Sequence, residues 1–141
     1  MALEYKNLVV WRRADDLFIE VHQLTHQRFP VSERYELGTQ MRRAAFSVPS
    51  NVVEGNARQT TRDKLKFFNC AAASLSELTY GLHVAHRLGY IDSAEHARLD
   101  EAARMVAGPL YGLIRAQRKR LTVKAATCVG LLMMSAGSMM T

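Results

Sequence analysis

Residues 29–55 read FPVSERYELGTQMRRAAFSVPSNVVEG. In the second half of this stretch the apolar residues recur at spacings of four, three and four, which is typical of a helix: Met41, Ala45, Val48 and Val52. Pro49 interrupts that pattern, although a proline inside a helix removes a backbone donor at a cost of about 3 kcal/mol. A helix that keeps this proline needs support from tertiary packing. We therefore predict a helix that is kinked near Ala45, whose carbonyl loses its partner.

Three more helices are predicted around this one. Apolar residues at helical spacing indicate helices from about Leu8 to Arg28, from Arg62 to Leu88 and from Asp92 to Leu121. No alternating strand pattern competes with them. Short loops between long helices favour an all-α fold, an antiparallel up-down four-helix bundle whose second helix is kinked.

Residues at the predicted helix ends support these boundaries. Asn7, Thr39, Thr60 and Asp92 are predicted N-caps, and Glu95 completes an Asp-x-x-Glu capping box. Pro30 is expected to end the first helix and Gly89 the third. Gly108 and Pro109 are expected to bend the fourth helix.

Several motifs together resemble a known family. They are Phe29-Pro30, Glu33-Arg34-Tyr35, Leu37, Gln40, Arg42-Arg43, Ser47-Val48-Pro49, Asn51-Val52-Val53-Glu54-Gly55, Arg58, Ser74-Leu75-Ser76-Glu77-Leu78 and Leu88-Gly89-Tyr90-Ile91. As a set, over about residues 3–120, they resemble the "four helix bundle protein" family. That family includes proteins encoded by intervening sequences in large-subunit ribosomal RNA genes, and it is similar to the accessory protein of diversity-generating retroelements. Glu36 and Ala73 depart from the family pattern, which often has glycine at both places.

The resemblance has implications for assembly and activity. It implies a four-helix protomer that assembles into a ring, usually five-fold, so a homopentamer is expected. It also implies nucleic-acid binding in some members and brings no catalytic residues to this chain.

The length and composition indicate one globular domain and a distinct tail. The chain has 141 residues, 48% of them hydrophobic and 23% charged. We predict a bundle domain over residues 1–124. Residues 125–141 carry no charge and include four methionines, so we predict a loosely ordered apolar tail, too interrupted by polar residues to span a membrane. The two cysteines are expected to be free thiols, and the protein is expected to be cytoplasmic.

The net charge of +6 is concentrated in two blocks. Residues 30–66 carry seven basic and four acidic groups, and residues 115–124 carry five basic groups and no acid. Such clusters indicate either a nucleic-acid footprint or a solvated helix face. The candidate nucleic-acid-binding residues are Arg42, Arg43, Arg58, Arg62, Lys64, Lys66, Arg115, Arg118, Lys119, Arg120 and Lys124.

Polar residues around Pro49 are interpreted as structural rather than catalytic. Buried polar groups need partners, and a proline leaves one carbonyl without its own. The predicted structural network comprises Ser47, Asn51, Glu54 and Glu77. No nucleophile with a base and an orienting group is identifiable, so the chain is not expected to be an enzyme.

Two histidine pairs have a spacing that a metal site could use. His22 and His26 are four residues apart, and His83 and His86 are three apart. No glutamate has a histidine three residues later, as the di-iron bundle motif requires. We expect no metal site and no cofactor.

The function predicted from the sequence is therefore that of a non-enzymatic, oligomeric helical-bundle protein that binds RNA or DNA with little sequence specificity. Its expected partners are further copies of itself, nucleic acid, and a reverse transcriptase or another acidic protein, and no membrane. The alternative is a structural or protein-interaction scaffold that binds no nucleic acid.

Overall fold

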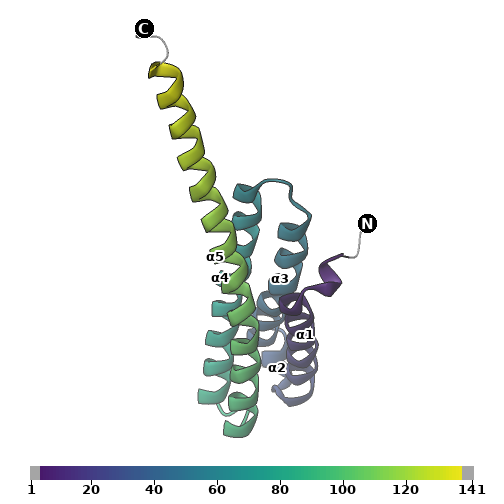
Figure 1. The fold of residues 1–141 in the computed structure, drawn as a ribbon. Coiled ribbons are helices and arrows are strands. Elements are labelled where there is room, and N and C mark those ends of the chain that lie inside the picture. Colours follow the sequence, from purple (N-terminus) through teal and green to yellow (C-terminus); the bar gives the residue numbers. More distant parts are fainter. Residues whose placement is uncertain (1–3, 138–141) are drawn as a thin grey trace.

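The computed structural model describes residues 4–137 and shows four long helices with two short helical turns (Figure 1). No strand occurs in this range. The elements are η1 (Glu4–Asn7), α1 (Val9–Arg28), α2 (Val31–Arg34), α3 (Leu37–Ala57), α4 (Thr61–Arg87) and α5 (Ser93–Gly137). The all-α four-helix bundle predicted from the sequence is confirmed.

One apolar core lies between α1, α3, α4 and α5. The predicted stripes of α3 and α4 are buried along their whole length, from Met41 to Val52 and from Phe68 to Ala85. In α5 the buried face runs from Leu99 to Ile114. The helical spacing therefore predicted the inward faces correctly, because apolar residues three and four apart share one side of a helix.

Several helix ends match the predictions. The Thr60 hydroxyl accepts a hydrogen bond from the Asp63 amide at 3.1 Å, and the Asp92 carboxylate accepts one from the Glu95 amide at 2.8 Å. Gly89 has a φ of +77°, which glycine adopts without strain, at the end of α4. Phe29 is extended before Pro30, where α1 ends.

Two predicted caps are wrong. Leu8, and not Asn7, is the residue that precedes α1, because Glu4–Asn7 forms a separate short helix. Helix α3, which corresponds to the predicted second long helix, begins at Leu37 rather than after Thr39. The Thr39 hydroxyl instead donates to the Arg34 carbonyl at 3.5 Å.

Helices α3 and α4 pack closely at two glycines. A Cβ atom on Gly55 would lie 2.6 Å from Cε1 of Phe68, and one on Gly81 would lie 2.7 Å from Cγ of Met41. Each glycine thus makes room for a side chain of the neighbouring helix. This places the end of α3 directly against the start of α4.

Both internal prolines lie within continuous helices. Pro49 is inside α3 and Pro109 is inside α5, and each helix continues past its proline. The bends expected near Ala45 and at Pro109 stay predictions.

The C-terminal end of α5 corrects two expectations. The helix does not end near Leu121, and residues 125–137 form more helix instead of a loosely ordered tail. Alanine, leucine and methionine favour helix, and no proline follows Pro109. This part of α5 extends away from the rest of the bundle (Figure 1). Residues 138–141, the end of the predicted tail, lie outside the described range.

Candidate nucleic-acid interface

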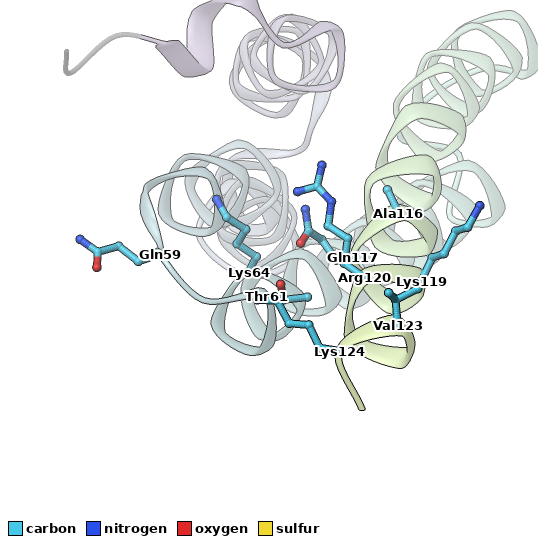
Figure 2. Close-up of a pocket in the computed structure, with 9 residues that line it drawn as sticks. All are labelled: Gln59, Thr61, Lys64, Ala116, Gln117, Lys119, Arg120, Val123 and Lys124. Carbon is cyan, nitrogen blue, oxygen red and sulfur yellow. The ribbon is translucent and has the colours of Figure 1, made fainter. Parts of the chain in front are cut away.

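The two basic blocks meet in a groove between the start of α4 and the part of α5 that leaves the bundle. We call this hollow of about 660 Å³ the basic groove (Figure 2). Its lining residues are Gln59, Thr61, Lys64, Ala116, Gln117, Lys119, Arg120, Val123 and Lys124. Four of them are cations and none is acidic. A concave surface lined by one sign of charge concentrates counter-ions of the other sign.

Side chains of the two walls line the groove in different directions. Gln117 and Arg120 extend from α5 toward the wall that carries Lys64, whereas Lys119 extends to the other side of α5 (Figure 2). The Lys64 ammonium donates to the Asn56 carbonyl at 3.1 Å, which holds it at the end of α3. The groove therefore presents cations from two elements that are far apart in the sequence.

Gln117 lies at the inner end of this groove and is only 7% exposed. Its Oε1 atom is buried and accepts no hydrogen bond within the described residues. Thr61, on the opposite wall, is 8% exposed. The floor of the groove is therefore polar, while its rim is cationic.

Arg42, another of the candidate nucleic-acid-binding residues, does not line the groove. Its guanidinium donates to Thr25 Oγ1 at 2.9 Å, to the Arg34 carbonyl at 2.8 Å and to Thr39 Oγ1 at 3.3 Å. Thr25 is fully buried. Arg42 thus joins the end of α1 to the end of α2, and its guanidinium donates to three acceptors within the protein.

Arg58 is also engaged by its own neighbours. Its guanidinium lies 2.9 Å from a Glu54 carboxylate oxygen and 4.6 Å from the centre of the Phe67 ring. The Lys66 ammonium lies 5.8 Å from the same ring. The other candidates are exposed outside the groove lining: Arg43, Arg62, Arg115 and Arg118. The groove therefore unites four of the eleven candidate cations.

The polar network near Pro49 differs in part from its prediction. The Asn51 amide donates to the Ser47 carbonyl at 2.8 Å and to the Ser47 hydroxyl at 2.9 Å. The Ser74 hydroxyl on α4 donates to the same Ser47 hydroxyl at 2.8 Å. This small network links α3 to α4 and is centred on Ser47 rather than on the Ala45 carbonyl.

Glu54 and Glu77 are not members of this network. Glu54 pairs with Arg58, as above, and Glu77 is exposed beside Tyr80 on α4. The sequence prediction missed Ser74. Ser74 follows three alanines in the sequence, and only its position on the side of the helix near Ala71 could have indicated that it contacts another helix.

The comparisons with known proteins agree with this architecture. The family model described as "23S rRNA-intervening sequence protein" matches residues 6–112. The chain belongs to this family. Its match ends before Lys119, Arg120 and Lys124, so the α5 wall of the basic groove lies beyond the matched residues.

One solved structure gives an independent comparison for this 23S rRNA-intervening sequence family member. It is a protein of unknown function from the S23 ribosomal protein family of Bacteroides thetaiotaomicron, 19% identical, with a TM-score of 0.71. The similarity covers 76% of this chain and 96% of that chain, and it shows a shared fold. No match was found among curated proteins.

The positions of the described histidine, cysteine and acidic side chains bear on metal binding and on titration in this family member. Within residues 4–137 no three histidine, cysteine or acidic side chains gather closely enough to hold a metal ion. The ring centres of His22 and His26 lie 4.7 Å apart. The pKa of His26 is lowered, first by partial removal from water and to a smaller extent by the charge of Arg42.

Cys70 and Cys128 are exposed and free. No helix in the described range has the length and apolar character needed to cross a membrane.

Proposed function

We propose that the protein is a non-enzymatic, homo-oligomeric nucleic-acid-binding protein whose contacts are mainly to phosphates. The observation that carries this proposal is the basic groove, which has four cations and no acid in its lining. Neutralised phosphates release counter-ions, and this is the largest general source of affinity between basic proteins and nucleic acids.

The groove favours binding with little sequence specificity. Phosphate contacts position a nucleic acid, whereas sequence is read by hydrogen bonds and apolar contacts to base edges. Lysines 64, 119 and 124 are point charges on flexible stems, and Arg120 is the only guanidinium in the lining. We therefore expect similar affinities for oligonucleotides of different sequence.

The family name suggests which nucleic acid to test first. It links family members to intervening sequences of 23S rRNA, so a structured RNA is the first ligand. Assembly would repeat the groove around an oligomer and raise the overall affinity through avidity. A homopentamer is the proposed state. Light scattering at micromolar concentration tests it, and a monomer would contradict it.

The decisive experiment is a salt titration. We expect fluorescence anisotropy to show binding of RNA, and of DNA of unrelated sequence, at about 50 mM salt, with affinity falling steeply toward about 200 mM. Absence of binding at the lower salt concentration would overturn the proposal.

A scaffold that binds proteins is the second candidate, and one surface favours it. A hollow of about 350 Å³ on α1 and α3 is lined by aromatic side chains, among them Trp11, Phe18 and Phe46. Phe46 is 57% exposed and stacks edge to face on Phe18, with ring centres 5.5 Å apart. Exposed aromatic residues of this kind are enriched in protein interfaces. Oligomerisation without any salt-sensitive RNA or DNA binding would support this function instead.

A further inference from the structure

The buried face of α5 follows an 11-residue spacing. Its first repeat is Leu99, Ala103 and Val106, and its second is Leu110, Ile114 and Gln117. All six residues are buried in the bundle. Eleven residues make three turns at 3.67 residues per turn, so this stripe runs almost straight along the helix.

The same spacing continues where the bundle ends. The third repeat is Leu121, Ala125 and Cys128, and the fourth begins with Leu132 and Ala136. Leucine therefore occupies the first position of all four repeats. Yet every residue from Arg118 to Ala136 is exposed. We call these five residues the tail stripe; it has the pattern of a core face but nothing covers it within the described structure.

The surroundings of the tail stripe indicate that it is an interaction surface. Residues 125–141 carry no charge, and Leu132 and Met134 are 69% and 79% exposed. An apolar surface of this extent marks an interaction site in a soluble protein. An isolated helix of this length is only marginally stable in water, so a partner would also stabilise its helical form.

We propose that the tail stripe packs against the tail stripe of a second copy of this chain in antiparallel orientation. Charge selects the orientation. Residues 115–124 hold five cations and no acid. A parallel pair would place these blocks side by side and repel. An antiparallel pair places each block beside the uncharged end of the other tail, several turns from the other block.

Side-chain size supports the same arrangement. When the two stripes are centred next to Cys128, Leu121 faces Ala136 of the partner subunit, and Ala125 faces Leu132 of the partner subunit. Each large residue then meets a small one, the arrangement by which facing helices interdigitate. Cys128 lies beside Cys128 of the partner subunit at the centre.

This pairing is separate from nucleic-acid binding and does not depend on it. Because an antiparallel pair places its two bundles at opposite ends, the sides of each bundle stay free for other contacts. Where bundles also form a ring, the tails would join two rings. The particle in solution should therefore contain an even number of chains, about ten where two of the proposed homopentameric rings are joined, and the ring alone is the state expected once the pairing is broken.

A matched pair of charge insertions tests the proposal. Leu132 lies on the tail stripe. Met134 lies on the opposite side of the same helix, because two residues at about 100° each turn about 200° around the helix axis. Both are exposed, so neither change disturbs the bundle. We expect Leu132→Glu to halve the particle mass measured by light scattering and Met134→Glu to leave it unchanged. Equal masses for the wild type and both variants would overturn the pairing.

Cross-linking provides a second measurement. In a Cys70→Ser background, diamide should join two chains through Cys128, and adding Leu132→Glu should reduce that product at least several-fold. Flotation with vesicles of phosphatidylcholine and phosphatidylglycerol distinguishes a lipid surface as the occupant. Vesicle binding that both glutamate variants reduce equally, with no Cys128 cross-link in solution, would contradict the proposal and assign the tail to lipid.

Discussion

The Arg13 guanidinium donates to the Met105 carbonyl at 2.8 Å, which joins α1 to α5. Met105 lies four residues before Pro109, so its carbonyl is the one that loses its helical partner to the proline. A side chain from another helix thus replaces a missing backbone donor. This contact explains how α5 continues through Pro109 while staying attached to the bundle.

We expect Arg13→Gln to lower the free energy of unfolding by about 1 kcal/mol, because the Met105 carbonyl loses its donor. Arg12→Gln, an exposed neighbour, is the matched control and should change it little. In a Pro109→Ala background, where the backbone amide returns, the effect of Arg13→Gln should shrink. Urea unfolding measures all three, and an undiminished effect in that background would contradict the explanation.

Arg42 and Arg43 are adjacent, but we expect them to behave differently. Arg42→Met should destabilise the protein by about 1–3 kcal/mol, because three acceptors on α1, the α1–α3 connection and α3 lose their donor. Arg43→Met should have little effect on stability, because Arg43 is exposed. Thermal unfolding of the two variants checks this. Similar melting temperatures would show that the Arg42 contacts do not stabilise the fold.

Gly55 and Gly112 provide a test of close helix packing. Alanine is favoured over glycine in helices by about 1 kcal/mol, so Gly112→Ala, whose Cβ would lie 4.0 Å from an Arg115 guanidinium nitrogen, should be neutral or stabilising. Gly55→Ala should instead destabilise by about 1–3 kcal/mol, because its Cβ would lie 2.6 Å from the buried ring of Phe68. Denaturant unfolding of both variants measures the difference. A stabilised Gly55→Ala would mean that α3 and α4 separate easily.

The basic groove makes a specific prediction about salt dependence. Replacing Lys64, Arg120 and Lys124 with glutamine should lower the slope of log affinity against log salt for single-stranded RNA by about 2, since each phosphate contact contributes about 0.7. Replacing Lys6, Arg12 and Arg87, three exposed cations outside the groove, should leave it nearly unchanged. Circular dichroism checks that both variants fold. Equal slopes for the two triple variants would place the phosphate contacts elsewhere.

His26 predicts a dependence of stability on pH. Its pKa is lowered in the fold, first by partial removal from water and then by the charges of Arg42, His22 and Arg34. The unfolded chain therefore binds a proton at His26 more readily than the native protein. Its contribution to stability is complete above the ordinary histidine pKa of about 6.5 and decreases as pH falls from there to the lowered native value. His26→Gln should reduce the drop in melting temperature between about pH 7.5 and 5.5; an unchanged drop would exclude His26 as its source.

The sequence predicted the parts of the fold that depend on local patterns. Helical spacing identified the stripes from Met41 to Val52 and from Phe68 to Ala85, and the caps at Thr60 and Asp92 follow from side-chain chemistry within one turn. Gly89 was predictable because a helix end often needs a positive φ.

The contacts between distant residues were not predictable in this way. Arg42 is a candidate nucleic-acid-binding residue from the sequence because it lies in a basic block. The sequence does not reveal that its guanidinium donates to Thr25, which lies seventeen residues earlier. Likewise, the spacing around Pro109 shows that a carbonyl loses its partner, but only packing reveals that Arg13 supplies a donor. The sequence identifies both charged blocks that contribute to the basic groove. It does not show that Lys64 and Arg120 line the same groove, because this depends on how α4 lies beside α5.

Burial along α5 ends at Gln117, and we expect the parts of the helix before and after this residue to open independently. Amides before this residue share the core, so we expect most of them to exchange with deuterium only when the whole bundle unfolds. Residues 118–136 are exposed, so we expect their amides to exchange quickly unless another molecule covers them. Amide exchange along this one helix therefore reports two equilibria: the unfolding of the bundle, and the binding of another molecule to the C-terminal part of α5.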